Sequence, residues 1–321
     1  MIAILKRLLT AIPLLIGITF ISFMLMQWAP GDPSSMLMDP QIKPEDMAMI
    51  KANLGLDKPY LHQYLIWLRE LVQGNFGYSY STGQPVLRII IERLPATLIL
   101  SISSLLFILC ITFPLGLISG YKKESWFDHS VTLISFIGLS IPTFWLGLVF
   151  ILYFSLDLGI LPSSGFHNPL LSHASLWVRT LDIAQHLCLP LFTIVIGGIA
   201  GLTRYHRFGI IKILKADYIL AARARGISEK RLLFKHAFKN AALPIITILG
   251  LQLPGLISGS FVIEYIFAWP GMGQLGVSAV FARDYPVLMG TLFFSAILII
   301  VGNLLADLAY SAIDPRIRKP S

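Results

Sequence analysis

The chain has 321 residues and a formal net charge of +8; 55% of its residues are hydrophobic, only 13% are charged, and the mean hydropathy is +0.74. This composition lies far from that of a soluble globular domain and indicates a protein embedded in a membrane. In such a protein the excess of positive charge reports the orientation of the spans, so we expect no binding to nucleic acid.

Six apolar stretches are long enough to cross the hydrocarbon core of a bilayer, which takes about 20 apolar residues. We therefore expect an all-α polytopic membrane protein with six transmembrane helices. Prolines occur inside these stretches, where neighbouring helices can satisfy the freed carbonyl groups. The expected spans, of which the fourth is the shortest, are 8–28, 96–119, 130–155, 187–203, 242–263 and 286–309.

The positions of Lys and Arg predict that both termini lie in the cytoplasm. The segment 204–241 alone carries ten of these residues, and cytoplasmic loops are enriched in them. The loop 120–129 and the tail 310–321 are then cytoplasmic as well. The extracytoplasmic segments are 29–95, between the first two spans, and 156–186 and 264–285.

The N-terminus resembles a signal peptide, because Lys6 and Arg7 precede an apolar run. The run extends to Trp28, which is too long for the apolar region of a signal peptide, and no A-x-A-like cleavage site follows. We therefore expect a retained first span.

The first extracytoplasmic segment should have structure of its own. A helical pattern opens at Pro44, a second helix with one apolar face is predicted over Tyr60–Gln73, and 74–85 is a turn-rich connector. A short amphipathic run, 86–93, leads into the second span. This segment either packs on the bundle as a cap or forms a contact surface for a partner that delivers substrate.

The cytoplasmic segment should contain two short helices. We expect Asp217 to cap a first helix over Tyr218 to Arg225, and Gly226 to end it in a left-handed conformation. Ser228 is expected to cap the second helix.

One face of the first of these helices is built from small side chains, Ala221, Ala222 and Ala224, so a partner surface can approach it closely. The alternative is that this basic loop only holds the topology of the chain.

The last extracytoplasmic segment contains a tight reversal. Trp269-Pro270-Gly271 and Gly273 force the turn, and 274–281 can resume as a short helix. Irregular backbone near membrane depth persists only where protein or a water-lined cavity covers it. The pattern fits either a re-entrant turn at the outer mouth of the bundle or an ordinary loop.

Several of these motifs resemble the permease subunits of ABC importers for oligopeptides and dipeptides, and they occur in that family's order. The cytoplasmic loop resembles the family's "EAA" loop at Ala221-Ala222, Gly226 and Leu243-Pro244. Leu220 stands in place of the glutamate that names the motif, and the distance from Gly226 to Leu243-Pro244 is longer than in sugar-importer permeases; both departures are familiar within the peptide-importer branch. Elsewhere the matching stretches are NLGLDKPY, GNFGYS, ERLPAT, FAWPGMG, RDYP and NLLADLAYSAIDPRIR.

The resemblance covers essentially the whole chain, and one permease domain is expected over about 94–310. The partners that the resemblance implies are a second homologous permease, two cytosolic ATP-binding subunits, an extracytoplasmic peptide-binding protein and the lipid bilayer of the bacterial cytoplasmic (inner) membrane. The chain would form half of a pathway for short peptides and couple ATPase motion to alternating access, with Gly226 as a pivot. Related permeases serve nickel complexes or glutathione, so those substrates stay open.

The resemblance also assigns roles to residues. Residues expected to couple to the ATPase are Asp217, Tyr218, Ala221, Ala222, Arg223, Arg225, Gly226, Ser228, Lys230 and Arg231. Residues expected at the outer mouth, facing the binding protein, are Trp269, Pro270, Gly271, Gly273, Asp284, Tyr285 and Pro286.

The sequence lacks the motifs that catalysis of ATP hydrolysis or metal binding would need. It contains no G-x-x-x-x-G-K-[ST] phosphate loop, no H-E-x-x-H or paired-cysteine metal spacing and no G-x-S-x-G nucleophile motif. We therefore expect a non-catalytic subunit with no cofactor and no metal.

Isolated acids within or beside the spans, Glu264 and Asp307, are expected to form hydrogen bonds and not a proton relay. The rival interpretations are an ATP-independent secondary transporter or channel, and a membrane-embedded enzyme.

Overall fold

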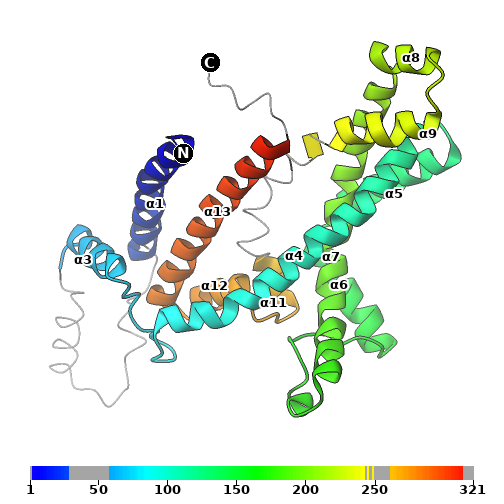
Figure 1. Ribbon diagram of the computed structural model, residues 1–321. Helices are drawn as coiled ribbons and strands as arrows, with labels where there is room; N and C mark the ends of the chain where they lie inside the picture. The colour runs from blue at the N-terminus through cyan, green and yellow to red at the C-terminus, as the bar shows by residue number, and fades with distance from the viewer. Residues whose placement is uncertain (1, 29–57, 243, 246–247, 249–260, 314–321) are drawn as a thin grey trace.

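The computed structural model describes residues 2–28, 58–242, 244–245, 248 and 261–313, and describes 2–9 and 305–313 as helix only. In these ranges the regular structure is helical, apart from one isolated antiparallel bridge between Tyr78 and Pro85. The longer helices are arranged as an open bundle (Figure 1). The all-α fold class predicted from composition is therefore confirmed.

The helices differ widely in length, from 39 residues in α7 to three in α9. Short π-helical (η2, η4) and 3₁₀ (η3) segments connect some of them. In chain order the elements are α1 (Ile2–Trp28), α3 (Tyr60–Val72), α4 (Val86–Tyr121), α5 (Trp126–Ser140), α6 (Thr143–Phe150), η2 (Ile151–Asp157), η3 (Pro169–Leu171), α7 (Leu176–Leu214), α8 (Asp217–Ala224), α9 (Glu229–Arg231), η4 (Leu232–Phe238), α11 (Phe261–Ile266), α12 (Met272–Phe281) and α13 (Tyr285–Ile313).

Four of the described helices, α1, α4, α7 and α13, are long and apolar enough to cross a membrane, and the bent pair formed by α5 and Thr143–Asp157 makes up to five such spans. Most of the expected fifth span, 242–263, lies outside the described residues. The described ranges therefore confirm the prediction of a helical polytopic protein, whereas the count of six spans stays a prediction.

The expected third span is divided by a sharp bend. The axes of Trp126–Ser140 and Thr143–Asp157 differ by 96°. Ile141 is extended, with ψ 123°, and Pro142 follows it. Proline disfavours the helical conformation in the residue before it and lacks a backbone N–H. The sequence placed one uninterrupted span over 130–155, whereas the structure has two helices there.

The centre of the bundle is the contact between α4 and α7, which is the most extensive contact between two helices in the described residues. Gly116 and Gly120 of α4 lie directly against His206 and Ile210 of α7, since a Cβ on either glycine would be 2.7 Å from those side chains. Small residues allow two helix backbones to approach closely in a membrane. This close contact makes α4 and α7 one unit.

A smaller cap joins α3 to α1. The hydroxyl of Tyr64 donates to the Ile16 carbonyl at 3.1 Å and lies 3.0 Å from the hydroxyl of Thr19. The predicted apolar face of α3 is only partly covered, since Tyr64 is buried while Leu61 and Val72 are exposed. The helical pattern expected at Pro44 lies outside the described residues.

The start of α1, the end of α13 and the short helix α8 lie toward the same side of the bundle, and α3 and α12 lie toward the other (Figure 1). This arrangement separates two polar regions of the chain. One surrounds α8 and the other surrounds the turn before α12.

Candidate functional site

The turn between α11 and α12 is built around a buried carboxylate. The Glu264 side chain has no solvent exposure. Its carboxylate accepts hydrogen bonds from the Thr97 hydroxyl at 3.0 Å and from the backbone N–H groups of Gly273 and Gln274 at 2.7 and 3.2 Å. Those N–H groups belong to the first turn of α12, whose cap residue, Gly271, makes no side-chain capping hydrogen bond. A carboxylate in this place satisfies free donors and interacts favourably with the helix dipole.

Two hydrogen bonds connect the turn to α4. The hydroxyl of Thr97 accepts from the Met272 N–H at 2.7 Å, and the Trp269 indole N–H donates to the Ala96 carbonyl at 2.8 Å. Trp269 is fully buried. The turn is therefore packed against α4.

The approach of the chain to Glu264 requires residues without a side chain. A Cβ on Gly271 would overlap Glu264 and Thr97, and a Cβ on Gly273 would lie 2.7 Å from the backbone Cα of Phe261. The sequence predicted a tight reversal with a following helix over 274–281, and the structure has both, with α12 beginning at Met272.

A second buried carboxylate, Asp284, joins two distant segments. It accepts from the Ser79 hydroxyl at 2.5 Å, the Ser81 hydroxyl at 2.8 Å and the backbone N–H groups of Tyr80 and Ser81, each at 3.1 Å. Burial, with a further contribution from Asp284, raises the pKa of Tyr80. The connector 74–85 and the start of α13 thus form one unit, although 205 positions separate Ser79 from Asp284.

We expect Asp284→Ala to lower the free energy of unfolding by about 3 kcal/mol, because it leaves several buried donors without an acceptor, each at a cost of about 1–3 kcal/mol. Asp284→Asn keeps one acceptor oxygen and should lose about half as much. Denaturation of the purified chain in detergent measures both, with the exposed acid Asp157 changed to alanine as the control. Equal stability of Asp284→Ala and wild type would contradict the structural role of this carboxylate.

The predicted outer-mouth residues divide into buried and partly exposed groups. Trp269, Gly271, Gly273 and Asp284 are buried, whereas Pro270, Tyr285 and Pro286 are partly exposed. Exposed residues of the same segment include Ala268 and Arg283, which border these positions, and also Tyr265, Ser278, Val280 and Phe281.

The segment 204–241, predicted to be a cytoplasmic loop, begins inside α7, which continues to Leu214. Lys215 and Ala216 separate α7 from α8, and Asp217 is the first residue of α8. The prediction that Asp217 caps this helix is wrong, because Ala216 occupies the cap position and no side chain caps the helix. The Asp217 carboxylate still lies in the first turn, where negative charge is favourable.

The end of α8 agrees with the sequence. The helix ends at Ala224, and Gly226 follows in the left-handed region with φ 80°. Ser228 occupies the cap position of α9, as predicted, although its side chain makes no capping hydrogen bond. The second arm continues from α9 into η4.

Two polar contacts close the loop on itself. The Arg223 guanidinium donates to both carboxylate oxygens of Glu229, at 2.5 and 3.1 Å. Asn240 donates to the hydroxyl of Tyr218 at 3.1 Å. The hydrogen bond and the charge of Arg223 lower the pKa of Glu229. Arg223 is thus engaged within the loop, whereas the exposed Arg225, Lys230 and Arg231 form no ion pair within the described residues.

The outer face of α8 is small and accessible. Ile219 is fully buried and Ala222 is partly buried, so these residues form the inner face. Ala221 and Ala224 are exposed on the opposite face, beside the exposed Tyr218. The exposed side of α8 therefore combines the small side chains of Ala221 and Ala224 with the large apolar side chains of Tyr218 and Leu220.

We expect Gly226→Val to reduce the stability of the loop by about 1–2 kcal/mol, because a left-handed residue with a Cβ is strained by about that amount. Gly226→Asn should lose less, since asparagine tolerates this conformation. No atom lies within 4 Å of the position of an added Cβ, so the difference reports backbone strain alone. Amide hydrogen exchange of residues 217–231 measures it; equal exchange in Val and Asn variants would contradict the left-handed turn.

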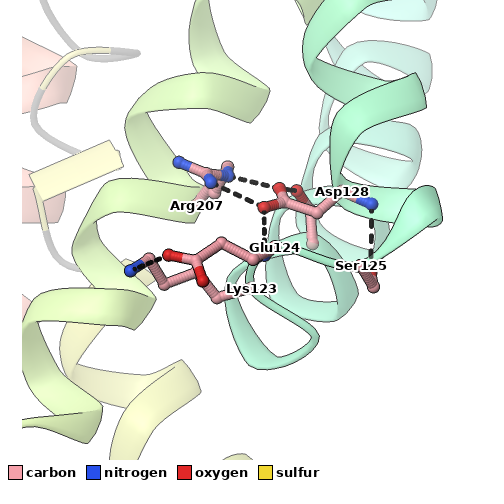
Figure 2. Close-up of polar contacts among 6 residues, drawn as sticks. Lys123, Glu124, Ser125, Asp128 and Arg207 are labelled. Carbon is pink, nitrogen blue, oxygen red and sulfur yellow. Dashed lines mark hydrogen bonds and ion pairs between the residues drawn. The ribbon is translucent and has the colours of Figure 1, made fainter.

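A third polar cluster was not predicted from the sequence. Asp128, in the first turn of α5, is buried, and Figure 2 shows its carboxylate facing the guanidinium of Arg207 on α7. Arg207 donates from Nε and, at 2.6 Å, from Nη2. The Ser119 hydroxyl and the Glu124 N–H, the latter at 2.9 Å, also donate to this carboxylate.

A local signal for part of this cluster is present in the sequence. Ser125-Trp126-Phe127-Asp128 has the spacing of a capping box, and the Ser125 hydroxyl accepts from the Asp128 N–H at 3.2 Å. That signal predicts the start of a helix, but it does not predict the partner on α7.

Comparison with protein families gives a match over most of the chain. The family model described as "Binding-protein-dependent transport system inner membrane component" matches residues 112–319, and a model for the N-terminal part of such membrane components matches residues 1–101.

Several curated proteins are similar over nearly the full length. The oligopeptide transport system permease protein AppB of Bacillus subtilis is 45% identical over 315 residues, which cover 98% of each chain. The di/tripeptide transport system permease protein DppB of Pseudomonas aeruginosa is 38% identical, over 98% of this chain and 97% of its own length. The dipeptide transport system permease protein DppB of Alkalihalophilus pseudofirmus is 35% identical, over 98% of each.

Among solved structures, a chain of the MetNI methionine ABC transporter in an inward-facing conformation has a similar fold. The TM-score is 0.57 with 18% sequence identity, over 71% of this chain and 97% of that chain. At this identity the likeness concerns the fold alone.

Proposed function

Because the chain belongs to the family of inner-membrane components of binding-protein-dependent transport systems, we propose that it forms one half of the pathway of an ATP-driven importer of short peptides. It is a multi-pass protein of the bacterial inner membrane. The observation that carries the proposal is the match over nearly the whole chain to permease proteins of oligopeptide and dipeptide transport systems.

We assign the remaining parts of the importer to partner chains. A second homologous permease completes the pathway, two cytosolic subunits bind and hydrolyse ATP, and an extracytoplasmic binding protein delivers the peptide. The absence of a phosphate-binding motif in this sequence supports the assignment of ATP hydrolysis to a partner. Family membership favours this function over an ion-driven transporter or a channel.

The ATPase docks, in this proposal, on the outer face of α8. Its two small exposed residues, Ala221 and Ala224, allow close approach, and the exposed Arg225, Lys230 and Arg231 offer positive charge around it. Closure of the ATPase dimer then displaces α8, and α7 carries the displacement into the bundle. Such a rigid-body movement of packed helices switches a transporter between two states.

At the opposite end, the turn around Glu264 shapes the outer mouth. The burial of Trp269 and Asp284 supports a framework role for them, because a buried side chain has no surface to offer a docking protein. We assign contact with the binding protein to the exposed Ala268 and Arg283 in the same segment. The proposal thus separates the residues expected at the outer mouth into buried residues that hold the turn and exposed neighbours that contact the binding protein.

The test is purification of the tagged chain from its native membrane in mild detergent, with bound proteins identified by mass spectrometry. We expect a second permease, P-loop ATPases and a peptide-binding protein to co-purify. A chain that purifies alone and moves solute in liposomes without ATP would overturn the proposal.

A further inference from the structure

The contact between Asp128 and Arg207 lies where the ATPase-binding loop joins the bundle. Arg207 is on α7, about two turns before the helix ends at Leu214 and the chain enters α8. Asp128 is in the first turn of α5. The pair therefore links the base of the loop to the start of the helix that precedes the 96° bend.

The loop and the end of α7 form one packed unit. Ile210 of α7 and Ala237 of η4 are both fully buried in the same apolar cluster as Leu117 of α4, and Phe238 packs against it. Because α8 contacts both η4 and α7, a force on α8 would reach α7 through this unit, near Arg207.

α5 packs along α7, where Phe136 lies beneath the Arg204 guanidinium and Gly138 faces Ala200, and at its start it contacts this unit through the carboxylate of Asp128. Asp128 is 1% exposed and accepts from α7 through Arg207, from α4 through Ser119, and from the intervening turn through the Glu124 N–H. Glu124 itself has φ 65°, so the turn between α4 and α5 is held in an uncommon conformation. One carboxylate therefore holds three parts of the chain together.

This ion pair differs from the others in the described residues. Arg88–Glu92, Lys123–Glu124 and Arg223–Glu229 are exposed and join residues close in sequence, and the buried contact of His186 with Asp182 joins residues only four positions apart. Asp128 and Arg207 are 79 positions apart and largely shielded from water. A buried ion pair is weak evidence for net stability, because its desolvation offsets its attraction. Its two-pronged geometry instead fixes the relative position of the groups that it joins.

We infer that Asp128 and Arg207 are positioning residues that make α5, and with it the bent α5–α6 segment, follow α7 when the cytoplasmic loop is displaced. The inference rests on the proposed function, in which a partner ATPase supplies that displacement. Neither residue contacts the transported molecule in this scheme. Their role is to couple movement at one end of α7 to the bend in the neighbouring span.

The experiment uses the complex purified with its partners and placed in lipid vesicles. Asp128→Asn keeps an acceptor for Ser119 and removes the charge, and Arg207→Lys keeps the charge and removes the two-pronged contact. Glu124→Gln is the matched control, since it removes a negative charge from the same turn, where the exposed side chain pairs only with Lys123. Imported peptides from a tryptic digest of casein are counted by mass spectrometry against ATP hydrolysed.

We expect both pair variants to hydrolyse ATP and to import about tenfold less peptide for each ATP, a loss within the usual range of coupling between sites. Glu124→Gln should keep the wild-type ratio. A merely structural role would lower the amount of assembled complex and leave the ratio unchanged, and that result would overturn the inference.

A distance measurement separates this inference from the proposed function. Spin labels are attached at the exposed positions His129 on α5 and Lys212 on α7, after Cys110 and Cys188 have been replaced by alanine. We expect one narrow distance distribution in the wild type, with and without ATP, and a broad one in Asp128→Asn. Unchanged distributions overturn the inference even if the complex imports peptides. If the distribution broadens in Asp128→Asn but the wild-type complex imports no peptide, the inference about Asp128 and Arg207 stands and the proposed importer function is refuted.

Discussion

Glu264→Ala is expected to destabilise the protein by about 3–5 kcal/mol, because it removes the acceptor for two buried donors and a partly buried one, and a buried donor costs about 1–3 kcal/mol when unpaired. Those donors are the hydroxyl of Thr97 and the N–H groups of Gly273 and Gln274. The loss should appear as a lower unfolding temperature in detergent and as less protein in the membrane. ATPase binding by the fraction that folds should persist, because α8 lies at the other end of the bundle (Figure 1).

Two further variants show whether hydrogen bonding is the cause. Glu264→Gln keeps one acceptor oxygen but turns an amide N–H₂ toward the remaining donors, so we expect a smaller loss of about 1–2 kcal/mol. Thr97→Val should also destabilise, because it removes the acceptor for the Met272 N–H. A wild-type unfolding temperature for Glu264→Ala would show that this carboxylate does not hold the turn.

Ala221→Trp is expected to abolish peptide uptake, to below about a tenth of wild type, because a bulky side chain on the accessible face of α8 would hold a docked surface away, and loss of contacts worth about 1.4 kcal/mol already weakens binding tenfold. The side chain of residue 221 is exposed, so the folded permease should keep its stability. Co-purification of the ATPase subunits and ATP-dependent uptake in vesicles measure the two effects.

The control is the same substitution at Ala184, an exposed alanine in the first part of α7 and far from α8 along the helix. Ala184→Trp should retain ATPase binding and uptake. If Ala221→Trp binds the ATPase as wild type does, the docking surface is elsewhere on the loop. Loss of binding accompanied by a lower unfolding temperature would indicate damage to the fold instead of a blocked surface.

Local rules predicted much of the secondary structure. The turn at Gly226 and the helix start at Ser228 were found because glycine in the left-handed conformation and serine before a helix act within a few residues. The helix of Tyr60–Val72 was found from its periodicity. The same rules misplaced the cap of α8 by one residue, because the preference for Asp at the cap and in the first turn is similar.

The roles of the buried acids could be predicted from the sequence only in part. Glu264 was expected to be a hydrogen-bonding group, and the structure confirms this, but its position under the first turn of α12 was not predicted. Asp284 belonged to a predicted outer-mouth segment, yet its partners Ser79 and Ser81 come from another segment. Asp128 lies in the loop predicted over 120–129, and no role was predicted for it.

The sequence by itself determined that this protein lies in a membrane, that it is helical and to which family it belongs, because hydropathy, periodicity and motif order are properties of the chain read residue by residue. Only the tertiary structure decided which polar residues are exposed and which join distant helices. The pair of Asp128 with Arg207 and the contacts of Asp284 depend on segments that are far apart in sequence and meet when the helices pack. The bend of 96° after α5 also belongs to the folded molecule, since a proline permits a break but the packing of the bundle sets its angle.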